Sequence, residues 1–170
     1  RLQASSKIPL MIGMDGEWGL AMRLDSTVHY PYQMTLGAIR NDTIIYEMGK
    51  DIGKQFKRMG MHVNFAPVVD VNNNSMNPVI NYRSFGEDRL NVAKKGTAYM
   101  RGMQSEGVMA NAKHFPGHGD TDSDSHLSLP VIDHDMARLD SIELFPFRQM
   151  MNRGLSSVMV AHLYIPALDS

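Results

Sequence analysis

Gly107-Val108-Met109-Ala110-Asn111-Ala112-Lys113-His114 is a short apolar run that ends in two basic side chains. Three similar runs occupy residues 8–14, 62–66 and 156–161. All four are rich in Val, Ile or Met and are bounded by Gly or Pro, as buried parallel strands are. Helical patterns separate them, and strands that alternate with helices indicate a parallel sheet. The sequence therefore predicts an α/β fold.

Three helices are predicted between and after these strands. Asn41 and Asp42 form a typical helix cap, and the apolar residues that follow recur near the 3.6-residue period as far as Gly60. A second helix is expected over residues 87–105. A third is expected over residues 136–152, with a break at Pro146, because proline lacks the N–H that a helix interior needs.

Polar side chains follow all four predicted strands: Asp15, Asp70, Lys113 with His114, and His162. Polar groups from several strand ends that meet on one face are typical of barrel active sites. An open sheet more often has a single Gly-rich phosphate turn, and no such motif occurs here. Because a (β/α)8 TIM-type barrel usually takes ~250 residues, residues 1–170 are expected to form about four βα units of one.

The composition excludes several classes of partner. Lys plus Arg number 17 and Asp plus Glu 18, so the net charge of −1 does not favour nucleic acid or an anionic membrane. The absence of cysteine excludes disulfides and thiolate sites. No apolar run approaches the ~20 residues of a membrane span. The first residue is Arg1, so a signal segment could have preceded it and the compartment stays open.

The densest cluster of ionisable residues lies in residues 113–126, Lys-His-Phe-Pro-Gly-His-Gly-Asp-Thr-Asp-Ser-Asp-Ser-His. Within it, Asp124 and His126 are two residues apart, a spacing that points both side chains the same way on an extended segment. A carboxylate beside an imidazole favours the protonated ring and fixes its orientation. The pair is therefore a candidate general acid/base that works near neutral pH.

The same stretch allows a metal-dependent hydrolase, because imidazole and carboxylate groups are suitable zinc ligands. His-x-x-x-His spacing makes a metal site most naturally on a helix, and Pro116-Gly117 prevents a helix between the first two histidines. The candidate ligands are His114, His118, Asp120 and His126.

Residues 113–121, followed by Asp124-Ser125-His126 and Leu129-Pro130, resemble the signature of β-N-acetylglucosaminidases of glycoside hydrolase family 3, the branch that includes bacterial peptidoglycan-recycling enzymes. The resemblance covers most of the chain. It extends to Asn64-Phe65-Ala66-Pro67-Val68-Val69-Asp70, Asn77-Pro78-Val79-Ile80, Arg83-Ser84-Phe85 and Val160-Ala161-His162.

The resemblance implies an N-terminal (β/α)8 barrel that removes terminal β-linked N-acetylglucosamine with retention, through a covalent glycosyl-enzyme. It implies His126 as the acid/base and Asp124 as its dyad partner. The sugar-binding residues that it implies are Asp15, Arg83, Lys113 and His114. His162, at the expected active face, is predicted to line the site. No metal and no cofactor are expected.

Two departures from the family pattern stand out. The family's Asp-Gln-Glu-Gly-Gly-Arg is replaced by Asp15-Gly16-Glu17-Trp18-Gly19-Leu20, so Trp18 is expected to stack on sugar or to fill the barrel mouth. No residue matches the family's nucleophilic Asp, which lies on a later strand.

Three functions stay open on the sequence: part of a glycosidase, an inactive sugar-binding half barrel, and a metal hydrolase. The expected partners are an N-acetylglucosaminide or peptidoglycan fragment, and either the rest of the parent chain or a second copy of this one.

Overall fold

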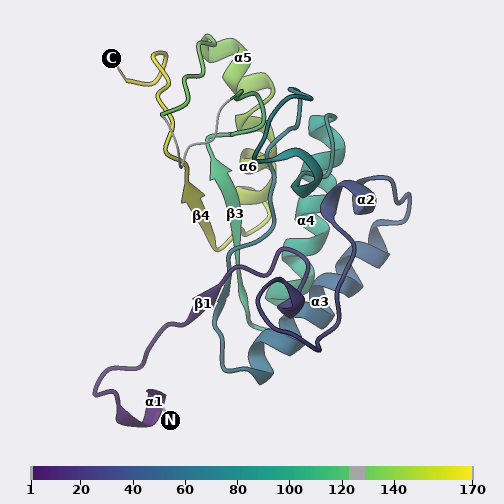
Figure 1. The fold of residues 1–170 in the computed structure, drawn as a ribbon, viewed down its shortest axis with the longest axis vertical. Coiled ribbons are helices and arrows are strands. Elements are labelled where there is room, and N and C mark those ends of the chain that lie inside the picture. Colours follow the sequence, from purple (N-terminus) through teal and green to yellow (C-terminus); the bar gives the residue numbers. More distant parts are fainter. Residues whose placement is uncertain (1, 123–128, 170) are drawn as a thin grey trace.

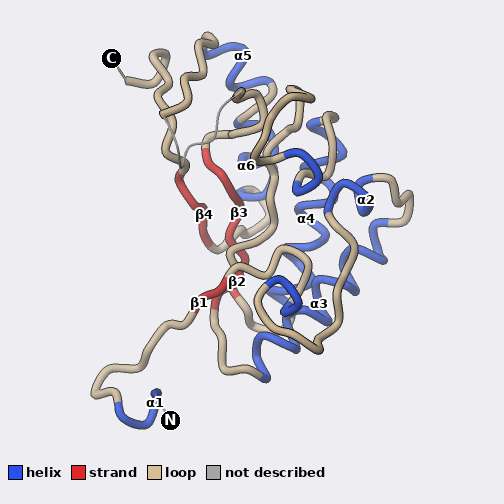
Figure 2. The backbone as a smooth tube through the Cα atoms, in the orientation of Figure 1, coloured by secondary structure: helices blue, strands red, loops and turns tan. Residues whose placement is uncertain are grey.

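A four-stranded parallel sheet forms the centre of the computed structural model, which describes residues 2–122 and 129–169. Its strands are β1 (Gly13–Met14), β2 (Val63–Asn64), β3 (Met109–Phe115) and β4 (Ser157–Val160). They lie in the order β1-β2-β3-β4, so each strand pairs with its neighbours in the sequence (Figure 2). This arrangement confirms the predicted α/β fold and the partial barrel. The candidate dyad, Asp124 and His126, lies outside the described residues.

The first strand is much shorter than predicted. The apolar run at 8–14 suggested a buried strand, but Ile8 and Met11 are 77% and 73% exposed, and only Gly13 and Met14 pair with β2. Residues before Gly13 extend away from the sheet toward α1 (Leu2–Ser5) (Figure 1). The apolar composition of this run predicted that it would be buried, but no strand of the described residues pairs with residues 8–12 and covers them.

Two long helices pack against each other and cover one side of the sheet (Figure 1). They are α3 (Asp42–Arg58) and α4 (Arg89–Ser105), close to the predicted ranges. The Asn41 side chain accepts from the Thr43 N–H, and the Asp88 side chain accepts from the N–H groups of Leu90 and Asn91. Such caps satisfy N–H groups that have no partner inside the helix.

The predicted third helix is two helices, α5 (Met136–Ser141) and α6 (Leu144–Met151). The break falls at residues 142–143, slightly before the position that Pro146 suggested. Pro146 lies in the first turn of α6, where its missing N–H costs no hydrogen bond. Four shorter elements have no strong period in the sequence and were not predicted: α1, α2 (Gln33–Gly37) and the 3-10 turns η1 (Leu20–Met22) and η2 (Asn81–Arg83).

The core lies between the sheet and these helices. From α3 and α4 it takes fully buried side chains that follow the helical period: Ile45, Ile52, Phe56, Tyr99, Met100 and Met103. The core therefore holds the carboxyl ends of the strands in fixed positions, and the polar residues that follow them form the site.

No helix in residues 2–122 and 129–169 has the length and apolar character needed to cross a membrane.

Candidate active site

A pocket of about 470 Å³ lies at the carboxyl ends of the strands. Its volume is within the range of roughly 300–1,000 Å³ that is usual for small-molecule sites. Charged and polar groups line it from the loops that follow β1 and β2, from β3 and from the residues after β4: Asp15, Glu17, Arg23, Arg83, Lys113, His114, His118 and His162. The convergence of strand-end residues that the sequence predicted is therefore present.

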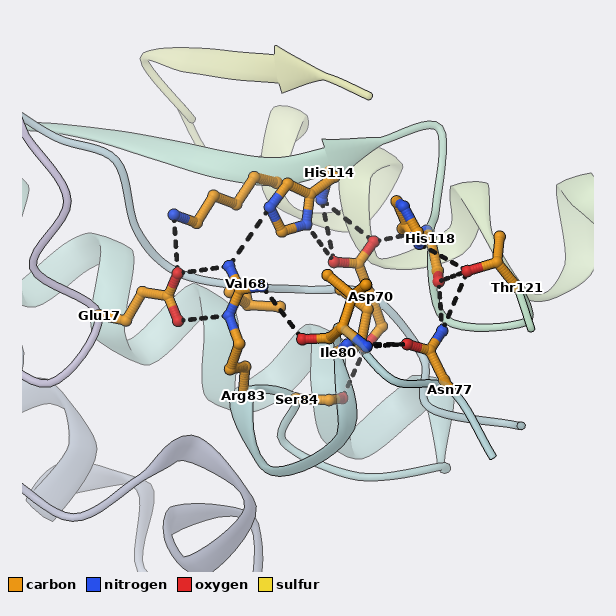
Figure 3. A network of polar contacts seen from close by, with 12 residues as sticks. Glu17, Val68, Asp70, Asn77, Ile80, Arg83, Ser84, His114, His118 and Thr121 are labelled. Atoms are coloured by element: carbon orange, nitrogen blue, oxygen red, sulfur yellow. Dashed lines mark hydrogen bonds and ion pairs between the residues drawn. The ribbon is translucent and has the colours of Figure 1, made fainter. Parts of the chain in front are cut away.

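Glu17 is the centre of the charge network in this pocket. Its side chain is 1% exposed, and both of its oxygens bind Arg83, with Nη2 to Oε1 at 2.7 Å and Nε to Oε2 at 3.0 Å (Figure 3). Lys113 Nζ lies 2.8 Å from Glu17 Oε1 and 2.8 Å from Asp15 Oδ1. Burial alone would raise the pKa of Glu17, but the hydrogen bond to Arg83 and the two cations outweigh burial and lower it. Glu17 is therefore a carboxylate that holds two cations at the pocket wall.

Asp70 fixes the main chain and the ring of His114. The buried Asp70 carboxylate accepts from the backbone N–H of His114 at 3.1 Å and of His118 at 2.7 Å, and it lies 2.8 Å from His114 Nδ1 (Figure 3). A carboxylate only accepts, so Nδ1 of His114 carries the hydrogen and Nε2 faces Arg83 Nη2 at 3.5 Å. Burial would raise the pKa of Asp70, but His114 and the donated hydrogen bonds outweigh it and keep the pKa low.

Lys113 and His114 are consecutive residues of β3 and yet both line the pocket. Neighbouring residues of a regular strand point to opposite faces of the sheet. The pairing between β3 and β4 shifts register between Lys113 and Phe115, and such irregularities often redirect a side chain beside an active site. The irregular end of β3 thus supplies two adjacent site residues.

His118 is 2% exposed and also lines the pocket. Its Nδ1 lies 2.7 Å from the hydroxyl of Thr121, and Asn77 Nδ2 donates to its backbone carbonyl at 2.7 Å. Among the described residues its Nε2 has no hydrogen-bond partner. Burial lowers the pKa of His118, although the charge of Asp70 opposes this. His118 is therefore a neutral ring at neutral pH.

The structure brings together the four residues that the resemblance implies as sugar-binding, Asp15, Arg83, Lys113 and His114, and the predicted site-lining residue His162, since all of them line this one pocket. Asp15 is also held by Arg23, whose Nη2 donates to Oδ2 at 2.9 Å. The candidate dyad is outside the described residues. Trp18 is not among the described residues that line the pocket; it packs edge-on against Tyr32 with ring centroids 4.9 Å apart.

Comparison with known proteins places the chain in a family. Residues 1–170 match the N-terminal domain of glycosyl hydrolase family 3. The chain is 40% identical to β-hexosaminidase A of Pseudoalteromonas piscicida over 174 residues, which cover 99% of this chain and 29% of that protein. The chain belongs to glycosyl hydrolase family 3. This confirms the resemblance drawn from the strand-end motifs.

Solved structures agree with the fold of this family 3 domain. A family 3 β-N-acetylglucosaminidase from Paenibacillus sp. str. FPU-7 is 46% identical, with a TM-score of 0.89, over 94% of this chain and 31% of that one. NagZ from Neisseria gonorrhoeae in complex with N-trifluoroacetyl-D-glucosamine is 31% identical, with a TM-score of 0.89, over 98% of this chain and 51% of that one. The chain spans 29% of the length of the Pseudoalteromonas protein and 49% of the length of a β-hexosaminidase of Thiobacillus denitrificans.

Sequence reasoning missed three charged or polar residues of the family 3 pocket: Glu17, Arg23 and His118. Glu17 received no role, although it stands two residues after Asp15, and the rule that aligned Asp124 with His126 would have placed it on the same side as Asp15. His118 was considered only as a metal ligand. Its contact with Asn77 joins residues 41 positions apart, and no spacing in the sequence signals that contact.

The structure does not bring the described members of the predicted zinc set into one group of ligand atoms. His114 Nδ1 is bound to Asp70 and His118 Nδ1 to Thr121. Asp120 instead lies with His134 and Glu143, and within residues 2–122 and 129–169 these three are the groups whose ligand atoms come close enough for one metal ion; none of them lines the pocket. His126, the fourth candidate, is outside the described residues.

Proposed function

We propose that this domain belongs to a retaining β-N-acetylglucosaminidase and supplies its sugar-binding pocket and its acid/base. The observation that carries the proposal is the pocket itself, in which Glu17 joins Arg83 and Lys113 beside Asp15 and His114. Relatives named as β-hexosaminidases, and a NagZ structure that holds an N-acylated glucosamine, support the same substrate class.

The pocket suits a sugar ring because its charged side chains are already held in place by ion pairs with one another. Glu17 and Asp15 hold the cations of Arg83 and Lys113 before any substrate enters, so little reorganisation is needed on binding. Carboxylates have further lone pairs that accept from hydroxyl groups, and the guanidinium and ammonium groups donate to hydroxyl and carbonyl oxygens. Both kinds of group are present on a 2-acetamido sugar.

The acid/base in this proposal is His126, oriented by Asp124. It would protonate the leaving oxygen in the first step and activate water in the second, as the acid/base of a retaining glycosidase does. The nucleophile is a carboxylate about 5 Å from the acid/base. We assign it to a later part of the parent protein, because no residue of this chain matches the family's nucleophile motif.

The first test is substrate choice in the parent protein. The value of kcat/KM for 4-nitrophenyl N-acetyl-β-glucosaminide should exceed that for 4-nitrophenyl β-glucoside by at least about 10²-fold, because a site built to pair an acetamido group leaves its own polar groups unsatisfied without one. Equal values for the two substrates would contradict the proposal.

The second test concerns the dyad. His126→Ala or Asp124→Ala should slow hydrolysis of an alkyl N-acetylglucosaminide by ~10² to 10⁴, and the nitrophenyl substrate far less, because only the poor leaving group needs a proton. His62 precedes β2, at the end of the strand away from the pocket. His62→Gln is therefore the control and should change the rate of hydrolysis of neither substrate. Equal losses on the two substrates would remove His126 from this role, and a stoichiometric zinc requirement would favour the metal hydrolase instead.

A further inference from the structure

Four aromatic rings from the loops after β1 and β2 contact one another beside the sugar pocket. Tyr32 is the centre of the group, and its ring centroid lies 4.9 Å from that of Trp18, 5.5 Å from that of His29 and 4.7 Å from that of Tyr82. Trp18 and His29 also stack on each other, with centroids 6.1 Å apart. None of the four is among the described residues that line the pocket. We call these four residues the aromatic platform.

The aromatic platform adjoins the pocket at two points of the chain. Trp18 directly follows Glu17, and Tyr82 directly precedes Arg83. Glu17 and Arg83 form the ion pair of the pocket wall (Figure 3). Burial would lower the pKa of the Arg83 guanidinium, but its hydrogen bond to Glu17 and the charges around it raise it. One of those charges is the phenol of Tyr82, which ionises before arginine does. The pocket wall therefore continues into the platform.

Buried hydrogen bonds hold the backbone that carries these rings. Gln33 follows Tyr32 and is 2% exposed; its side-chain amide donates to the carbonyl of Val68 at 2.7 Å and accepts from the Val68 N–H at 3.1 Å. The buried Tyr99 of α4 donates its hydroxyl to the carbonyl of the residue before Trp18 at 3.2 Å. Rings on a fixed backbone lose little conformational entropy when a ligand binds them.

The rings stay open to solvent although they contact one another. Tyr32 and Tyr82 are 38% and 48% exposed, and His29 is exposed as well. Rings that served only to fasten the two loops together would be buried between them. Contiguous apolar surface that remains exposed usually marks a binding site.

We propose that the aromatic platform binds the second sugar of the substrate, the one to which the terminal N-acetylglucosamine is linked. This rests on the proposed function, because an enzyme that removes a terminal residue meets a second sugar only on the leaving side. One face of a pyranose ring carries mainly C–H groups, which pack on the electron-rich face of an aromatic ring. The hydroxyls of Tyr32 and Tyr82 and the ring nitrogens of His29 are suited to the hydroxyl groups at the edge of the sugar.

The test uses two substrates of the parent protein, N,N′-diacetylchitobiose and methyl N-acetyl-β-glucosaminide, of which only the first has a second ring. Both have a poor leaving group that needs a proton, so acid catalysis affects them alike. The variants are Trp18→Ala and Tyr82→Ala, with Trp18→Phe and Tyr82→Phe as variants that keep a ring. Tyr46→Ala is the matched control, because Tyr46 lies in a groove between α3 and α4 that shares no residue with the sugar pocket.

We expect each alanine variant to lower kcat/KM for the disaccharide about tenfold, since one ring contact is lost, with little change for the methyl glycoside. The two phenylalanine variants should keep most of the disaccharide activity, and the control should match the wild type on both substrates. Equal losses on the two substrates, or no loss on the disaccharide, would overturn the proposal.

Binding without turnover gives a measurement that does not depend on the folding of the alanine variants. Trp18 is the only tryptophan of the 170 residues, and the fluorescence difference between the wild-type parent and Trp18→Phe isolates its signal. The thio-linked disaccharide, with sulfur in place of the glycosidic oxygen, should change this signal at saturation, whereas methyl N-acetyl-β-glucosaminide should not. An unchanged signal with the thio-linked disaccharide would exclude contact between Trp18 and the second ring.

The platform and the proposed function can fail separately. A parent that hydrolyses the methyl glycoside but shows neither the selective loss nor the fluorescence change would refute the platform and leave the proposed function standing. A parent that binds the thio-linked disaccharide at Trp18 but hydrolyses neither substrate would support the platform and refute the proposed function.

Discussion

Glu17 is a carboxylate with almost no contact with water, held between two cations. Removing one partner of such a buried network leaves the others unpaired, which typically costs about 3–5 kcal/mol. Glu17→Gln should therefore lower the free energy of unfolding by about 3 kcal/mol or more, and it should also raise KM for the acetamido sugar. Chemical unfolding of the parent, followed by circular dichroism, measures the first effect.

The control for Glu17→Gln is Asp140→Asn, which removes an exposed ion pair with Arg148, worth about 1 kcal/mol or less. If the two substitutions cost the same, Glu17 is not the centre of the pocket's charge network.

The buried ring of His118 predicts a pH dependence of stability. Its pKa in the folded protein is lowered from the ordinary value of 6.5, so the unfolded chain binds a proton there more readily than the folded one. The contribution of the neutral His118 ring to the free energy of unfolding is complete above pH 6.5. It is lost as the pH falls below 6.5, by at most about 1.4 kcal/mol per pH unit. His118→Gln should flatten this slope in urea titrations between pH 6.5 and 5. The same slope in wild type and variant would refute this assignment.

At the scale of single elements, the caps of α3 and α4 contribute separately to the free energy of unfolding. Asn41→Ala removes one accepted N–H at α3, and Asp88→Ala removes two at α4. Each should cost about 1 kcal/mol of stability, with the greater loss for Asp88. Thermal unfolding compares them with Glu87→Ala, an exposed neighbour that caps nothing. A loss for Glu87→Ala as large as that for Asp88→Ala would show that the effect is not capping.

The sequence predicted α3 and α4 well, because an apolar period and a terminal glycine agree in each and a cap marks the start of α3. It predicted the strands by position but not by length, since apolar composition at 8–14 does not require a partner strand. The pocket residues after each strand were predicted because parallel strands end on one face. The bonds from Asp70 to His114 and His118 join residues 44 and 48 positions apart, and no local pattern encodes such a contact.

At the scale of the whole molecule, the outer strands of the sheet lack a second neighbour among the described residues. The order β1-β2-β3-β4 leaves β1 and β4 each paired on one side, and Val160 of β4 is 68% exposed. Exposed parallel edges associate with other chains, and a closed barrel removes them.

The isolated 170 residues should therefore self-associate and should not hydrolyse N-acetylglucosaminides, for which we also expect the nucleophile to be missing. Light scattering and an assay with the nitrophenyl substrate test both expectations. A monomer with ordinary turnover would show that the domain is self-sufficient in fold and in chemistry.

The carboxylate of Asp70 has a consequence for protein engineering. It comes from the loop after β2, but the groups that it binds, on His114 and His118, come from the end of β3 and its loop. Asn77 makes the same crossing to Thr121. A chimera that exchanges either loop alone would therefore leave the buried Asp70 carboxylate without its partners. Exchanging residues 68–86 and 113–121 together would keep those contacts, but Arg83 and Lys113 would still need the carboxylates of Glu17 and Asp15, so the loop after β1 has to be exchanged with them.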